Sequence, residues 1–141
     1  MIKKGSAAWK GGLKDGTGTI STETGVLKNA PYGFKSRFED GPGTNPEELL
    51  AAAHAACFSM ALSLMLGQEN LTPESIRTTG EVTLDKDGEG YTITASHLIV
   101  KAKVPGADAA TFDRIANKAK AVCPLSKVLN AKITMDATLE A

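Results

Sequence analysis

An uncharged run from residue 49 to residue 66 constrains the fold of this chain more than any other feature. A helix start precedes the run, because Asn45 is a favoured N-cap residue and Pro46 suits the first helical position. Two glutamates follow, where the helix dipole favours carboxylates. Gly67 is typical of the position just beyond a helix end. The pattern predicts a long helix from Pro46 to about Leu66.

Small and apolar residues surround this predicted helix on all sides, so we expect it to be buried around its whole circumference. The run also reaches the lower length limit of a membrane span. His54, Ser59 and Ser63 interrupt its apolar character, however, and a domain of 141 residues needs a central helix. We therefore expect a core helix with a self-associating surface, and no membrane association.

The segments around the central helix have the alternating patterns of strands. Residues 7–9 and 17–22 predict an amino-terminal hairpin, and residues 34–39 predict an extended segment with Phe34, Ser36 and Phe38 on one face. Further along the chain we expect a long antiparallel hairpin (81–84 and 91–104), a second helix (108–123) with Phe112, Ile115, Ala116, Ala119 and Val122 at helical spacing, a short turn (126–129) and a final strand (133–139). With no repeat or linker, residues 1–141 form one α+β domain in this interpretation.

The charge balance excludes some classes of partner. Sixteen basic and sixteen acidic residues cancel, and aromatic residues make up only 5% of the chain, so nucleic-acid binding is not expected. No apolar run follows the amino terminus, so we expect no signal peptide and a cytoplasmic location.

The two cysteines, Cys57 and Cys123, are the candidate reactive groups, since thiols in a reducing compartment are more often free or redox-active than structural. Cys57 lies in the middle of the predicted helix, so its pKa stays high unless a cation stabilises the thiolate. Cys123 lies at the C-terminus of the second predicted helix, where the partial negative charge of the carbonyl groups destabilises a thiolate. This asymmetry suggests that Cys57 attacks and Cys123 resolves, although a small core residue is an equal interpretation of Cys57.

Other polar residues leave further alternatives open. A zinc site from His54, Cys57, Cys123 and His97 is one, although no short-spaced ligand pair supports it. The charged residues nearest the helix start are Arg37 and Glu47. An arginine fork can pair with a carboxylate and still donate to a thiolate, but an ordinary surface ion pair is the competing interpretation.

Three segments resemble the osmotically inducible protein C (OsmC) branch of the OsmC/Ohr family, in which Ohr denotes organic hydroperoxide resistance. They are GTNPEELLAAAHAACFSMAL at residues 43–62, AKAVCPLS at 119–126 and the stretch from residue 21 to residue 38. The resemblance covers essentially the whole chain. It implies an intertwined homodimer of α+β subunits, with antiparallel sheets, a long central helix and a second helix.

The resemblance also implies a function. Members of the family are thiol peroxidases that reduce organic hydroperoxides to alcohols without haem, flavin or metal, so no cofactor is expected. By position, Cys57 matches the peroxidatic cysteine and Cys123 the resolving cysteine. Arg37 matches the arginine that steadies the thiolate, and Glu47 matches the carboxylate that holds this arginine. The expected role is defence against oxidative and osmotically induced stress.

The implied cycle passes through a Cys57 sulfenic acid and a Cys57–Cys123 disulfide, which an external dithiol, expected to be a lipoyl-bearing protein, reduces. Glu47 and Cys57 are ten residues apart, or about 15 Å along one helix, so the site is either composite across a dimer or bridged by the arginine side chain. The alternative function is a redox-sensing disulfide switch or a small-ligand binding protein without turnover.

Overall fold

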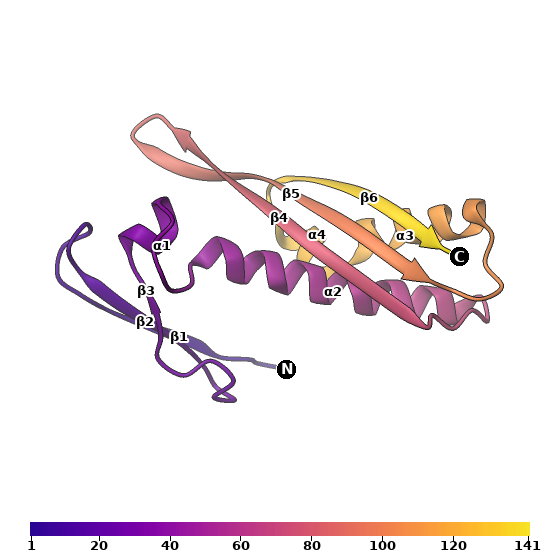
Figure 1. The fold of residues 1–141 in the computed structure, drawn as a ribbon, viewed down its shortest axis with the longest axis horizontal. Helices are drawn as coiled ribbons and strands as arrows, with labels where there is room; N and C mark the ends of the chain where they lie inside the picture. Colours follow the sequence, from indigo (N-terminus) through magenta and orange to yellow (C-terminus); the bar gives the residue numbers. More distant parts are fainter. The chain divides into compact units, whose positions relative to one another are not determined.

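The computed structural model describes residues 1–141 and has six strands and four helices, so the expected α+β class is confirmed (Figure 1). The chain divides into two compact units, Met1–Leu49 and Leu50–Ala141, each described below by itself. That the two units make one domain stays a prediction.

The first unit is built on an antiparallel sheet of three strands in the order β1-β2-β3: β1 (Gly5–Lys10), β2 (Thr17–Thr22) and β3 (Ala30–Tyr32). The predicted amino-terminal hairpin is confirmed, and β3 is an addition. Only glycine fits at position 18 on β2, because a Cβ atom there would lie 2.5 Å from the Tyr32 ring and 2.6 Å from the Trp9 ring. The absence of this side chain lets the two rings approach to 5.5 Å between centroids.

The segment expected to be extended, residues 34–39, is instead a short helix, α1 (Phe34–Phe38). Its first turn is closed by Ser36, whose hydroxyl accepts from the Gly33 N–H at 2.9 Å and lies 3.1 Å from the Gly33 carbonyl, to which it donates. Phe34 and Phe38 still share a face, with ring centroids 5.1 Å apart. A spacing of four residues satisfies both strand alternation and a helix face, which is why the pattern was ambiguous.

The long helix α2 (Pro46–Gln68) begins where the sequence predicts. The Asn45 side chain caps it by accepting from the Glu48 N–H at 2.7 Å. The Glu48 carboxylate accepts from the Thr44 hydroxyl at 2.8 Å. Asn45 is therefore the N-cap, as expected from its strong preference for that position.

The end of α2 is later than predicted, because Gly67 lies inside the helix. Asn70 takes the left-handed conformation (φ 61°) that ends the helix. The Leu71 N–H then donates to the Leu66 carbonyl at 2.9 Å, and the Asn70 N–H to the Gly67 carbonyl at 3.1 Å. These two bonds make a Schellman motif with asparagine in place of the usual glycine.

The second unit contains a sheet in the order β4-β5-β6: β4 (Ser75–Asp87), β5 (Gly90–Lys103) and β6 (Lys132–Glu140). β4 and β5 form the predicted antiparallel hairpin, with a longer first strand and a tight turn at Gly88 (φ 61°). β6 is the predicted final strand, but it runs parallel to β5 because the connection through two helices returns the chain to the same end of the sheet. The expectation of antiparallel sheets is therefore wrong for this pair of strands.

Two helices connect β5 to β6. The predicted second helix is α3 (Ala109–Val122), capped by Asp108, whose carboxylate accepts from the Thr111 N–H at 2.7 Å. The short α4 (Pro124–Val128) follows directly, and Cys123 separates the two helices. Val122, expected on the apolar face of α3, is instead 38% exposed.

The core of the second unit lies between α2, α3 and the sheet. Its buried apolar residues are Phe58, Leu62 and Leu66 of α2, Leu98, Val100 and Ala102 of β5, Val104, the α3 residues Phe112, Ile115, Ala116 and Ala119, and Cys123. The buried α2 residues recur every four positions, which defines one helix face.

The other face of α2 is open in the single chain, where Met60 is 76% and Leu64 63% exposed. The expectation of burial around the whole helix is therefore wrong for one chain, because a helix that packs on one face of a sheet buries one side only. By length and hydropathy α2 also qualifies as a candidate membrane span, a test that the core helix of a soluble protein passes as well.

Candidate active site

The second unit brings the two cysteines together. Cys57 lies about three turns from the start of α2, and Cys123 lies at the corner between α3 and α4. The Cys123 thiol donates to Cys57 Sγ at 3.2 Å, and neither sulfur is bonded in a disulfide. Cys123 is fully buried and Cys57 is half-buried, so the less buried cysteine is the one that the sequence predicts to attack.

The surroundings of Cys57 favour the neutral thiol. Burial raises the pKa of Cys57, and the nearby Cys123 thiol raises it further, whereas a hydrogen bond from the Leu125 backbone amide lowers it. The net direction is upward. A mid-helix cysteine therefore keeps a high pKa within its own unit, and ionisation at neutral pH requires a cation nearby.

The arrangement of the two sulfurs suits disulfide chemistry. A disulfide bond is about 2.05 Å long, so the two sulfurs need to approach by little more than 1 Å from their 3.2 Å separation. Cys57 is half-buried and Cys123 is buried beside it, and two thiols placed in this way can be joined in a disulfide.

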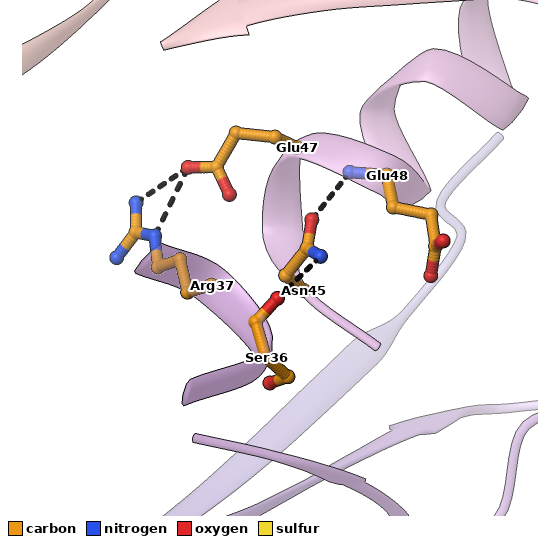
Figure 2. A network of polar contacts seen from close by, with 5 residues as sticks. All are labelled: Ser36, Arg37, Asn45, Glu47 and Glu48. Carbon is orange, nitrogen blue, oxygen red and sulfur yellow. Dashed lines mark hydrogen bonds and ion pairs between the residues drawn. The ribbon is translucent and has the colours of Figure 1, made fainter. Parts of the chain in front are cut away.

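The first unit pairs the two predicted charged residues (Figure 2). Arg37 on α1 donates from Nε at 3.0 Å and from Nη2 at 2.8 Å, in both cases to Glu47 Oε1. The Glu47 side chain is largely buried, whereas the Arg37 side chain is 38% exposed. The pair is therefore neither a loose surface pair nor fully buried, and the guanidinium retains access to solvent.

The position of α1 beside the start of α2 makes this pairing possible. The Asn45 side-chain amide donates from Nδ2 to the Ser36 carbonyl at 2.9 Å, and its oxygen caps α2 at the same time (Figure 2). One asparagine thus joins the helix that carries Arg37 to the first turn that carries Glu47.

Arg37 also lies at the edge of a cavity of about 270 Å³ in the first unit. Its other lining residues are mostly apolar and aromatic: Trp9, Leu13, Tyr32, Gly33, Phe34 and Phe38. Sequence reasoning missed this cavity, because its walls come from β1, β3 and the unexpected helix α1. The close spacing of Tyr32, Phe34 and Phe38 in a chain with few aromatic residues was the one available signal.

The two histidines do not join the cysteines in a zinc site. Both His54 ring nitrogens contact serine hydroxyls, Nδ1 that of Ser96 at 2.6 Å and Nε2 that of Ser126 at 2.8 Å. His97 lies on β5, with Nδ1 2.6 Å from the Thr134 hydroxyl and Nε2 3.0 Å from the Asp136 carboxylate. The structure gathers no group of three or more potential metal ligands from histidine, cysteine, aspartate and glutamate.

Comparison with known proteins gives consistent matches. The family described as OsmC-like protein matches residues 39–138. Peroxiredoxin OsmC of Escherichia coli (strain K12) is 60% identical over 138 residues, which cover 98% of this chain and 96% of that protein. The organic hydroperoxide resistance protein of Xanthomonas axonopodis pv. citri (strain 306) is 36% identical over 102 residues, covering 70% of this chain and 68% of that protein.

Solved structures agree with this result. The crystal structure of the organic hydroperoxide resistance protein OhrB of Bacillus subtilis superposes with a TM-score of 0.73 at 27% identity, covering 96% of this chain and 98% of that one. The expected OsmC/Ohr-like fold is therefore confirmed. Since the family match spans most of the chain and near relatives align over almost its full length, this protein belongs to the OsmC-like protein family.

Proposed function

We propose that this protein is a thiol peroxidase that reduces organic hydroperoxides to alcohols. The observation that carries the proposal is the 3.2 Å contact between the sulfur of half-buried Cys57 and that of buried Cys123. The names of its relatives, Peroxiredoxin OsmC and organic hydroperoxide resistance protein, support it. The proposed enzyme works in the cytoplasm with its two thiols and no cofactor, and protects the cell against oxidative and osmotically induced stress.

In the first step, the Cys57 thiolate attacks the terminal oxygen of the hydroperoxide. The O–O bond breaks, the alkoxide takes up a proton to become the alcohol, and Cys57 is oxidised to the sulfenic acid. The thiolate needs a cation, because burial raises the pKa of Cys57. We assign this role to Arg37, whose charge would also stabilise the developing alkoxide.

Glu47 orients the guanidinium in this proposal. The ion pair uses Nε and Nη2 of Arg37, which leaves Nη1 to donate to a thiolate or an alkoxide. A carboxylate that holds an arginine by two bonds restricts the side chain to one direction and reduces the entropy lost when it contacts the reacting atoms.

In the second step, the Cys123 thiol attacks the sulfenic sulfur of Cys57. The sulfur–sulfur bond forms and water leaves, so Cys57 is protected from a second oxidation. An external dithiol then reduces the disulfide to regenerate both thiols. The proposed reductant is a lipoyl-bearing protein.

The preference for organic over hydrogen peroxide follows from apolar surroundings. The α2 residues Ala56, Phe58 and Met60 beside Cys57 are apolar, and the one hydroxyl among them, that of Ser59, already donates to the Ala55 carbonyl at 2.8 Å. The aromatic cavity beside Arg37 has the same character. Burial of an alkyl or aryl group contributes binding free energy that hydrogen peroxide lacks.

We also propose that two chains form a homodimer. The exposed Met60 and Leu64 make part of α2 an apolar surface that a second copy would bury. Whether Arg37 and Glu47 then serve the Cys57 of their own chain or that of the partner is a separate question, for which a mixed dimer is the direct test.

Intact mass measured without reductant tests the proposed cycle. Reduced protein treated with one equivalent of tert-butyl hydroperoxide should lose two hydrogens, and dihydrolipoamide should restore the mass and sustain hydroperoxide consumption. The Cys57→Ser variant should do neither. An unchanged wild-type mass would show that Cys57 is an inert core thiol, and disulfide formation without sustained consumption would favour the alternative of a redox switch.

A further inference from the structure

A buried histidine joins three parts of the second unit close to the cysteines. His54 is fully buried and lies one turn before Cys57 on α2. Its Nδ1 lies 2.6 Å from the Ser96 hydroxyl on β5, and its Nε2 lies 2.8 Å from the Ser126 hydroxyl on α4. One side chain on α2 therefore holds the sheet on one side and the segment after Cys123 on the other.

The imidazole is suited to this role in its neutral form. Desolvation by burial lowers the pKa of His54, so the ring is neutral at physiological pH. A neutral imidazole has one N–H donor and one acceptor nitrogen. One serine hydroxyl therefore donates to the ring and the other accepts from it, and both ring nitrogens are satisfied.

The α4 segment touches α2 at consecutive positions. The Leu125 amide donates to the Cys57 sulfur, and the next residue, Ser126, contacts His54. Cys123, two residues before Leu125, contacts Cys57 itself. His54 and Cys57 are three residues apart and share one face of α2, so the same short segment lies against both of them.

Few other contacts hold this segment. None of the five residues of α4 is buried, and only Leu125 packs partly against the core. A helix of this length has little stability of its own. Polar contacts with α2 therefore account for a large share of what keeps α4 in place.

We propose that the hydrogen bond between His54 and Ser126 positions Cys123 for its attack on the oxidised Cys57. The inference rests on the proposed peroxidase function and deepens it, because it assigns positioning residues to the second step only. His54 is no part of the first step, in which Cys57 reacts with the hydroperoxide.

The consequence appears in the fate of the Cys57 sulfenic acid. Attack by Cys123 on the sulfenic sulfur forms the disulfide and releases water. Attack by the sulfenic acid on a second hydroperoxide takes up one more oxygen, gives the sulfinic acid and releases a second alcohol. If the corner between α3 and α4 holds Cys123 less firmly, the disulfide forms more slowly. A larger share of Cys57 is then oxidised to the sulfinic acid.

Ser126→Ala is the informative variant, since it removes one hydroxyl from the half-buried side of the contact and leaves the contact of His54 with Ser96. Ser126→Thr keeps the hydroxyl and should behave like the wild type. Ser59→Ala is the matched control: it removes another half-buried α2 contact, 2.7 Å to the Thr78 hydroxyl, that does not involve α4.

Two measurements separate positioning from general weakening of the fold. The first is the ratio of sulfinic acid to disulfide by intact mass after treatment with excess tert-butyl hydroperoxide. The second is the single-turnover rate of Cys57 oxidation in a Cys123→Ser background, which reports the first step alone. Ser126→Ala should raise the ratio by about tenfold, the equivalent of one lost hydrogen bond, and change the first-step rate by less than about twofold.

Two sets of results would overturn the inference. One is an unchanged ratio in Ser126→Ala while the wild type cycles normally, which leaves the proposed peroxidase function standing. The other is an equal rise of the sulfinic-to-disulfide ratio in Ser59→Ala, or a fall of the first-step rate in Ser126→Ala as large as the rise of the ratio. Either result would mean that the variant weakens the fold in general. A wild type that forms no disulfide overturns the peroxidase proposal as well.

Discussion

Arg37 donates twice to one oxygen of Glu47, Oε1, while the other carboxylate oxygen, Oε2, is buried without a hydrogen-bond partner. The burial of a carboxylate with one unpartnered oxygen costs free energy, and the single cation beside it offsets that cost. Removing either member of this ion pair therefore affects the other.

The contribution of the Arg37–Glu47 ion pair to stability gives the first prediction. Arg37→Ala should lower the free energy of unfolding by about 1–3 kcal/mol, a range below that of a fully buried pair because the arginine is partly solvated. The double variant Arg37→Ala/Glu47→Gln should recover part of the loss, since it leaves no buried charge. Urea unfolding of the single and double variants measures both effects, and a double variant less stable than Arg37→Ala would contradict the argument.

The pH dependence of the first step gives the second prediction. Burial raises the pKa of Cys57, and only the thiolate attacks, so the rate of Cys57 oxidation should increase as pH rises through that pKa. If Arg37 stabilises the thiolate, Arg37→Ala shifts this increase to higher pH, and Arg37→Lys, which keeps the charge, shifts it less. Single-turnover oxidation across the pH range measures the shift. Superimposable profiles for wild type and Arg37→Ala would remove Arg37 from this role.

A mixed dimer distinguishes sites within one chain from sites that combine two chains. One chain carries Glu47→Ala and the other carries Cys57→Ser, with different tags to isolate the heterodimer. If the carboxylate of one chain serves the cysteine of the other, one intact centre remains and about half of the wild-type activity is expected, since one of two centres survives. If it serves its own chain, activity falls to the level of the two parent homodimers.

The packing of β4 against α2 gives a prediction that depends on a glycine. A Cβ atom at Gly80 would lie 2.7 Å from the Ala51 carbonyl oxygen, which belongs to the helix backbone and has little freedom to move. Gly80→Ala should therefore lower the free energy of unfolding by about 1–3 kcal/mol. Gly67, inside the same helix, has open space around it, and Gly67→Ala should raise stability by about 0.5–1 kcal/mol. Thermal unfolding of both variants checks the opposite signs.

The sequence predicted the elements with strong local signals. The start of α2 was predictable because the capping residue and Pro46 act within one turn, and α3 was predictable because Asp108 caps a regular apolar pattern. The helix α1 was not, since Phe34 and Phe38 fit either a strand or a helix, and the deciding contact is a single hydroxyl, that of Ser36.

The site was predictable where chemistry alone marks a residue. The two cysteines were candidates at any separation in the sequence, but the Cys57–Cys123 contact depends on how α3 and α4 return to α2. Ser96 and Ser126 carry no signal in the sequence, because serine is common and their importance arises only from a histidine 42 and 72 residues away. Contacts of this kind depend on tertiary packing that no local pattern encodes.

The buried His54 should make the protein sensitive to acid. Desolvation holds the pKa of His54 below its ordinary value of 6.5, so the folded state favours the neutral ring. Below pH 6.5 the unfolded chain therefore binds a proton at His54 that the folded chain does not. The contribution of neutral His54 to the free energy of unfolding is fully present above pH 6.5, and it decreases as pH falls toward the lower pKa of the folded state. The midpoint of urea unfolding should decrease over that interval. His54→Gln, which does not titrate, should start from a lower stability but show a shallower decrease, and an identical slope in both proteins would assign the acid sensitivity to other groups.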